Sequence, residues 1–77
     1  MIRLELIQLS NDIVKYKYYP EQSTEYGVVG YDRKNNQPLI EKVVENYGRW
    51  YAIHAIPYLE SCQKTGKFDP NKIIAWY

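Results

Sequence analysis

The chain has 77 residues, of which 45% are hydrophobic and 25% charged, values typical of one small folded domain. The chain has ten Lys and Arg and nine Asp and Glu, and neither half concentrates charge of one sign. The composition therefore lacks the strong positive field of a typical phosphate-neutralising protein, although folding could still bring basic residues together in a patch. The single Cys excludes an internal disulfide, and no apolar run approaches the roughly 18 residues that span a bilayer; we therefore expect a cytoplasmic protein with no membrane partner.

Alternating side chains predict two strands at the start of the chain. In residues 2–9, IRLELIQL, apolar positions alternate with charged ones, which is the pattern of a strand with one buried face. Residues 13–19, IVKYKYY, alternate in the same way and stop before Pro20. The intervening SND, residues 10–12, is typical of a turn.

A third strand is expected over residues 25–31, EYGVVGY. Gly27 and Gly30 leave gaps in its wall of side chains, which indicates a bulge or a close approach by another element. The polar stretch DRKNNQP, residues 32–38, follows as a loop.

The next segment, LIEKVVENYG at residues 39–48, fits two structures. As a helix, it has apolar residues at i, i+3, i+4 and i+7, with Pro38 near its first turn and Gly48 after its end. As a strand, its β-branched residues suit a hairpin closed by the polar loop before it. We favour a strand over about residues 39–45.

Residues 47–65 are predicted to form the main helix. Gly66 is its expected C-cap, and Lys64 in the last turn complements the helix dipole. The chain then ends on an apolar stretch, for which we expect a final strand at about 72–77. These elements predict an α+β fold in a single domain, 1–77: an antiparallel sheet of four to five strands with the main helix packed on one face.

Four segments carry a resemblance to known proteins. KYKYYPE, YGVVGYD, YAIHA and IIAWY, in this order, resemble segments of a set of small uncharacterised proteins of Gram-positive bacteria and their phages. The likeness covers most of the chain and favours the strand reading of residues 39–45. No activity is assigned to that set, so the resemblance implies no functional residue.

One arc of the predicted helix collects the residues expected to pack on the sheet, at 100° per residue. Small side chains in this arc let the helix axis come close, and Tyr rings fill its flanks. A buried Cys in the arc behaves as a small hydrophobe. The arc comprises Tyr47, Gly48, Tyr51, Ala52, Ala55, Leu59 and Cys62.

Three other features of the helix bear on chemistry and shape. His54 lies at the margin of the packed arc, beside Tyr51 and Tyr58, where a hydrogen-bonded structural role is the expectation. It is about 12 Å along the axis from Cys62, too far for the base and nucleophile of one catalytic pair. Pro57 is expected to bend the helix, or alternatively to open a second one.

The side of the helix opposite this arc holds the first candidate site. Trp50, Ile53 and Pro57 project there, with Arg49 beside them. A Trp with apolar neighbours and an Arg has the composition of a protein-binding hot spot. The alternative is that the terminal IIAWY or the N-terminal strand covers these side chains.

The KYKYY segment holds the second candidate, an interface for single-stranded nucleic acid. Lys15, Lys17 and Tyr19 share one face of the strand, whereas Tyr16 and Tyr18 point to the core. Bases stack on aromatic rings, and cations hold the nucleic-acid backbone. The simpler alternative is a solvated row of lysines that protects an edge strand from aggregation.

No motif for catalysis or for a cofactor is present. One His and one Cys cannot supply a typical zinc site, and the sequence lacks HExxH, GxSxG and a phosphate-binding glycine loop. We therefore expect no metal, no cofactor and no enzymatic activity. The sequence favours a protein–protein interaction or accessory module, with an unidentified protein partner or a second copy of the chain, over the alternative of a protein that binds single-stranded nucleic acid.

Overall fold

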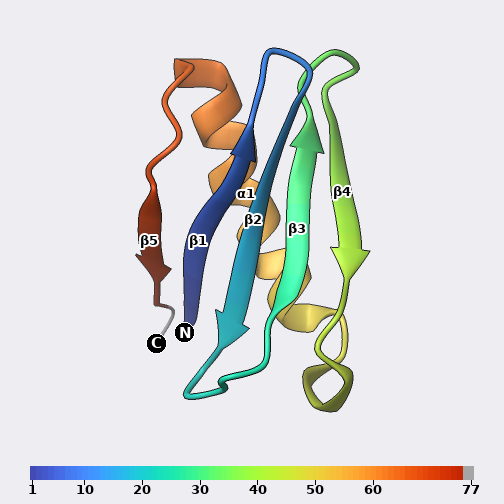
Figure 1. Cartoon of the computed structure of the whole chain (residues 1–77), viewed down its shortest axis with the longest axis vertical. Coiled ribbons are helices and arrows are strands. Elements are labelled where there is room, and N and C mark those ends of the chain that lie inside the picture. Colours follow the sequence, from blue (N-terminus) through green and yellow to red (C-terminus); the bar gives the residue numbers. More distant parts are fainter. Residues whose placement is uncertain (76–77) are drawn as a thin grey trace.

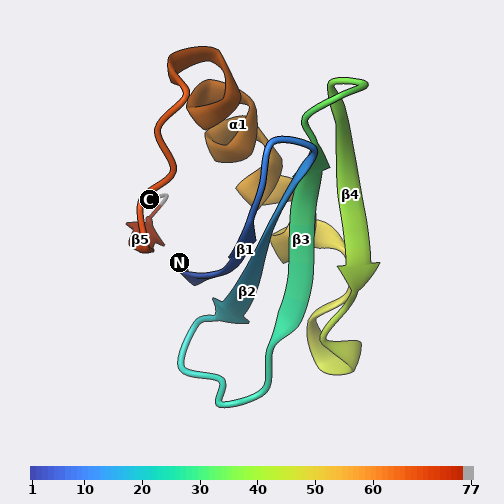
Figure 2. The same cartoon turned by 45° about the horizontal axis from the view of Figure 1, so that its top comes forward.

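An antiparallel sheet of five strands forms one layer of the structure, and one main helix lies across one of its faces (Figure 1). The structure is a computed structural model and describes residues 1–75. A tilted view shows the helix on one side of the sheet only (Figure 2). The predicted α+β class, with the helix packed on one face, is confirmed.

Seven elements follow one another in the chain: β1 (Ile2–Leu9), β2 (Ile13–Pro20), β3 (Gly27–Asp32), β4 (Gln37–Lys42), the 3-10 helix η1 (Glu45–Tyr47), α1 (Trp50–Thr65) and β5 (Asn71–Ile74). The first four strands form a meander in which each pairs with the next. The two helices then carry the chain across the sheet, and β5 pairs with the outer edge of β1. The strand order is therefore β4-β3-β2-β1-β5.

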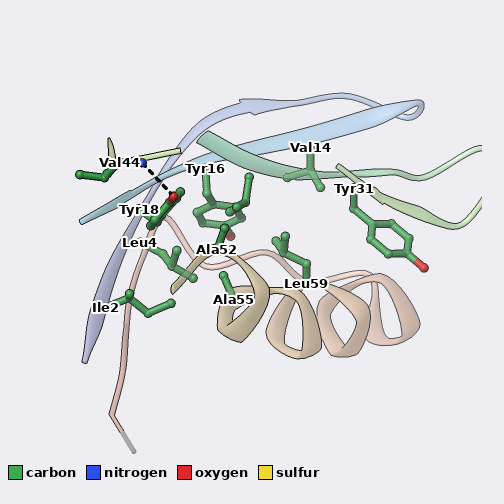
Figure 3. Packing of buried hydrophobic residues seen from close by; sticks show 11 residues of the cluster. Ile2, Leu4, Val14, Tyr16, Tyr18, Tyr31, Val44, Ala52, Ala55 and Leu59 are labelled. Atoms are coloured by element: carbon green, nitrogen blue, oxygen red, sulfur yellow. Dashed lines mark hydrogen bonds between the residues drawn. The ribbon is translucent and has the colours of Figure 1, made fainter. Parts of the chain in front are cut away.

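The core lies between α1 and the inner face of the sheet. Alternation along β1 and β2 turns every second side chain towards it, and Tyr16 and Tyr18 are fully buried there. Figure 3 shows small side chains of α1 facing the residues of the strands. The buried cluster comprises Ile2, Leu4, Val14, Tyr16, Tyr18, Val29, Tyr31, Val44, Ala52, Ala55 and Leu59.

Small residues of α1 let the helix approach the sheet. Ala52, Ala55 and Leu59 are completely buried and Cys62 nearly so, which confirms this part of the predicted arc. An alanine methyl leaves space for a large facing side chain, and interiors are packed to high density. The volume of the core therefore comes mainly from the sheet, above all from the tyrosines of β2.

Both buried tyrosines have hydrogen-bond partners for their hydroxyl groups. Tyr16 Oη donates to the carbonyl oxygen of Asp69 at 2.6 Å, and the amide of Val44 donates to Tyr18 Oη at 3.3 Å. A buried polar group without a partner would cost about 1–3 kcal/mol. These bonds let tyrosine serve as a core residue, and they tie β2 to the chain segments that precede and follow α1.

The main helix begins three residues later than the predicted boundary at residue 47. Residues 45–47 form η1, and Gly48 has φ +62°, a value outside the right-handed helical region. Gly48 is also exposed, so its predicted place in the packed arc is wrong. The predicted end is confirmed, because Gly66 has φ +76° and its amide donates to the carbonyl of Cys62 at 2.8 Å.

Pro57 lies inside α1. The helix continues past it to Thr65, so the alternative that Pro57 opens a second helix is wrong. Its missing N–H and its ring are tolerated on the exposed side of the helix, where Pro57 lies.

The hairpin between β3 and β4 is tighter than the predicted loop at 32–38. Asp32 ends β3, and its carboxylate accepts hydrogen bonds from the backbone and side-chain amides of Asn35 at 3.0 and 2.9 Å. Asn36, with φ +55°, completes the turn. The strand expected over residues 39–45 therefore starts earlier, at Gln37, and ends at Lys42.

The ends of the remaining strands differ in smaller ways from the prediction. β5 covers Asn71–Ile74, whereas the prediction extended over residues 72–77, of which Trp76 and Tyr77 lie outside the described residues. β2 pairs with β1 on one side and with β3 on the other, so it is an interior strand, and the addition of β5 beyond β1 makes it the central one. The interpretation of its lysines as protection for an edge strand is therefore wrong.

The predicted close approach at the glycines of β3 is confirmed. A Cβ atom at Gly27 would overlap the ring of Tyr18 and the carbonyl of Lys42, and one at Gly30 would overlap the carbonyl of Val14. The other alternative, a bulge at these glycines, does not occur: the register shift between Val28 and Val29 leaves the extra residue, Glu41, on β4.

Ala55→Leu should destabilise the fold by about 1–3 kcal/mol, because the extra methylene and methyl groups must fit into a closed core. Ile53→Leu is the matched control on the exposed side of the same helix turn, and it should change the free energy of unfolding by less than about 0.5 kcal/mol. Urea unfolding followed by circular dichroism measures both variants. Equal effects would mean that α1 does not present Ala55 to the sheet.

Candidate functional site

The surface of α1 that faces away from the sheet exposes the residues predicted to bind a partner. Trp50 exposes 50% of its surface and Ile53 53%, and Arg49 and Pro57 are exposed as well. The i, i+3, i+7 spacing of the three apolar residues places them along one side of the helix. The N-terminal strand β1 and the terminal strand β5 pair with each other in the sheet. We call Arg49, Trp50, Ile53 and Pro57 the helix patch.

Aromatic rings surround the Trp of the helix patch. The indole of Trp50 meets the ring of Tyr51 edge-on at 5.2 Å between centroids and that of His54 at 3.9 Å. Tyr51 in turn meets Tyr47 at 5.3 Å. The ring of His54 therefore packs on Trp50, a neighbour that the predicted position beside Tyr51 and Tyr58 did not include.

A polar contact ties the start of α1 to the connection between β2 and β3. Tyr51 Oη donates to Glu21 Oε2 at 2.8 Å, and the amino group of Met1 donates to the same oxygen at 2.9 Å. These two bonds, the one from Met1 first, lower the pKa of the Glu21 carboxyl, while the bond to Glu21 raises the pKa of Tyr51. The start of α1, which carries the helix patch, is thus hydrogen-bonded to the sheet layer through Glu21.

A second polar contact ties the middle of α1 to the chain before β5. Tyr58 Oη donates to Asp69 Oδ2 at 2.9 Å, and the rings of Tyr58 and Tyr16 meet edge-on at 6.1 Å. Burial raises the pKa of Tyr16 to about 12 and also raises that of Tyr58. Both phenols stay protonated at neutral pH and therefore donate hydrogen bonds to Asp69, which fix the chain before β5. For the same reason they are poorly suited to act as bases.

The outer face of the sheet carries the second set of predicted site residues. Lys15, Lys17 and Tyr19 lie on this face, opposite the buried Tyr16 and Tyr18, as the alternation predicts. The two lysines have different contacts, however. Lys15 Nζ forms an ion pair with Glu41 at 2.6 Å, whereas Lys17 Nζ lies over an aromatic ring.

That ring belongs to a cluster that sequence reasoning did not find in full. Lys17 Nζ and Lys42 Nζ lie 4.5 and 4.3 Å from the ring centroid of Tyr26, and Tyr26 lies 5.8 Å from Tyr19. Arg3 Cζ lies 4.7 Å from the ring centroid of Tyr19. We call Arg3, Lys17, Tyr19, Tyr26 and Lys42 the tyrosine–cation cluster.

The residues missed in this cluster come from three different parts of the chain. Alternation along residues 2–9 turns Arg3 away from the core, which is a signal in the sequence. Its place opposite Tyr19, however, depends on the register of β1 against β2. The place of Lys42 depends in turn on the register shift in β4.

Two hollows flank the tyrosine–cation cluster. One of about 440 Å³ lies between the β2–β3 connection and the end of β4, and Tyr26 and Lys42 are among its lining residues. The other, of about 210 Å³, lies over β2, β1 and β5, and Arg3, Tyr19 and Ile73 are among its lining residues. Each hollow combines an aromatic ring with a cation and also contains carboxylates, those of Glu25 and Glu45 in the larger hollow and that of Glu5 in the smaller.

Other features bear on chemistry and on membranes. Within residues 1–75, no group of three or more His, Cys, Asp or Glu side chains could hold a metal ion. Cys62 is a free thiol on the buried side of α1. No helix formed by the described residues has the length and apolar character needed to cross a membrane.

Comparison with protein-family models, with curated proteins and with solved structures found no match. The resemblance to small proteins of Gram-positive bacteria and their phages therefore stays a prediction. The functional argument depends on the geometry of the two surfaces alone.

Tyr16→Phe should destabilise the protein by about 1 kcal/mol at pH 7, because it removes the hydrogen bond to the carbonyl of Asp69. Above pH 10 this difference should shrink. The unfolded Tyr16 ionises at its ordinary pKa of 10.0, whereas the folded one keeps its proton up to about 12, so its contribution to stability is lost between these values. Urea unfolding of both proteins at pH 7 and pH 11 measures the change, and a difference independent of pH would contradict the burial of this phenol.

Proposed function

We propose that this protein is a non-enzymatic interaction module that binds another protein through the helix patch. One observation carries the proposal: the largest apolar side chain of α1, Trp50, points away from the core and is half exposed, next to the equally exposed Ile53. The core receives alanines from the same helix. Because each side chain is already half covered, burial of the rest of Ile53 against a partner would contribute roughly half of the 1.5–3 kcal/mol of a fully exposed aliphatic side chain, and burial of the rest of the larger Trp50 would contribute more.

The composition of the helix patch indicates the chemistry of the partner. Arg49 is exposed at the start of α1 and can donate two parallel hydrogen bonds to a carboxylate. Pro57 adds a rigid apolar surface at the other end of the patch. We therefore expect a partner that offers an apolar pocket for the indole of Trp50, with an acidic side chain at its rim.

The surroundings of the helix patch support tight binding. Trp50 is in contact with the rings of Tyr51 and His54, and Tyr51 is hydrogen-bonded to Glu21 across the two layers. Side chains already held in place lose less conformational freedom on binding, which improves affinity. We expect the module to act in the cytoplasm, because a lone thiol suits a reducing compartment.

Trp50→Ala should abolish capture of the partner while the fold stays intact, because Trp50 is half exposed and is not a member of the buried cluster. Affinity capture from the source cell, with wild-type and variant chains compared by mass spectrometry, measures the loss. A photo-reactive amino acid at Ile53 should cross-link to the same partner. The affinity of Trp50→Ala for the partner should be more than tenfold lower than that of the wild type, which is the effect of a typical hot-spot residue.

Ile73→Ala is the matched control, since Ile73 is 61% exposed but lies on the outer face of the sheet. It should capture the same partner as the wild type. A partner retained by Trp50→Ala would contradict the proposal, and so would a Trp50→Ala variant that unfolds. A wild-type dimer in solution that Trp50→Ala converts to a monomer would identify the partner as a second copy of the chain.

A further inference from the structure

We infer that the outer face of the sheet carries a second binding site, which takes single-stranded nucleic acid at the tyrosine–cation cluster. This site goes beyond the proposed function. It lies on the far side of the sheet from α1, so it shares no residue with the helix patch. Its constituents are the two things that such a ligand requires, positive charge for phosphates and half-exposed aromatic rings for bases.

None of the three cations of the cluster forms an ion pair with a carboxylate of residues 1–75, although Glu25 and Glu45 line the hollow beside Lys42. Arg3, Lys17 and Lys42 have no carboxylate within 4.0 Å among residues 1–75, in contrast to Lys15, which is paired with Glu41. Glu5 lies opposite Lys17 in the register but forms no ion pair with it. Three cations held close together by two rings therefore offer their charge to an anionic ligand.

An apolar floor holds the cluster in place. Val28 faces outward between Lys17 and Lys42 in the register, yet only 7% of its surface is exposed, although no helix formed by residues 1–75 covers this face. Lysine stems commonly lie along apolar surface and keep the charged head in water. The ammonium groups above Tyr26 thus rest on flexible stems that can move from the ring to a phosphate.

Stacking of a base on a tyrosine ring stabilises more than the contact of a cation with the same ring. An exposed cation–π contact stabilises by a factor of about two to five, whereas stacking of one base on an aromatic side chain stabilises by a factor of about five to 150. A base can therefore displace Lys17 or Lys42 from Tyr26, and the displaced ammonium group can bind the neighbouring phosphate. The hollows of about 440 and 210 Å³ beside Tyr26 and Tyr19 give room for such bases.

The geometry selects single strands. The cluster extends over four neighbouring strands, β1 to β4, which spans on the order of 15 Å at about 4.8 Å per strand. A sheet face this narrow suits a short run of unstacked nucleotides. In a duplex the faces of the bases are hidden in the stack, so Tyr19 and Tyr26 could not contact them.

The test is fluorescence anisotropy with a labelled oligothymidylate at about 50 mM salt, where the electrostatic contribution is large. The wild type should bind, and Tyr26→Ala should weaken binding at least fivefold. Tyr26→Phe keeps the ring and should bind as the wild type does. With three phosphate contacts, the logarithm of the binding constant should fall with the logarithm of the salt concentration with a slope of about −2.

Two further variants keep the test decisive if Tyr26→Ala fails to fold. Lys42→Gln should weaken binding and make the salt slope shallower, to about −1.4. Lys64→Gln removes the same charge from the last turn of α1 and should bind as the wild type does. No binding at 50 mM salt, equal effects of the two lysine variants, or equal binding of a duplex would each overturn the inference. Trp50→Ala should leave oligonucleotide binding unchanged, which separates this site from the helix patch.

Discussion

The structure depends on a single layer of apolar contacts between α1 and the inner face of the sheet. Such a small chain buries only about 60% of the surface that it exposes when unfolded, and the buried cluster of the described residues lies between these two layers. The sheet contributes large rings to this layer, among them Tyr16 and Tyr18, and the helix contributes the small side chains of Ala52 and Ala55. The tyrosine hydroxyl groups would be a penalty inside such a core if they lacked the partners that the chain on both sides of α1 provides.

This packing leaves two outward faces, one on each layer. A helix that gives alanines to the core can present Trp50 and Ile53 to the solvent without loss of buried volume. A sheet covered on one face only can carry charges and half-buried rings on the other. The helix patch and the tyrosine–cation cluster are thus the two consequences of one architecture. The site proposed for a protein and the site proposed for a nucleic acid therefore lie on opposite sides of the core.

The sequence predicts the features that follow from local periodicity. Alternation assigns Tyr16 to the core and Lys17 to the outer face, and helical spacing alone brings Trp50 and Ile53 together. What it does not predict depends on contacts between distant segments. The pairing of β5 with β1 makes β2 central, and the register brings Arg3 onto Tyr19. The start of α1 is likewise ambiguous, because the glycine that interrupts the helical pattern is compatible with either a helix end or a packed position until its backbone angle is known.

Nuclear Overhauser contacts of the alanine methyl groups test the central packing most directly. With 13C-labelled alanine, the methyl groups of Ala52 and Ala55 should show contacts to side chains on the inner face of β1, β2 and β3, as the buried cluster requires. The exposed Ala75, beyond β5, serves as the reference for a methyl group outside the core. Alanine methyl groups of α1 that contact only solvent or residues of their own helix would contradict the packing on which both outward surfaces depend.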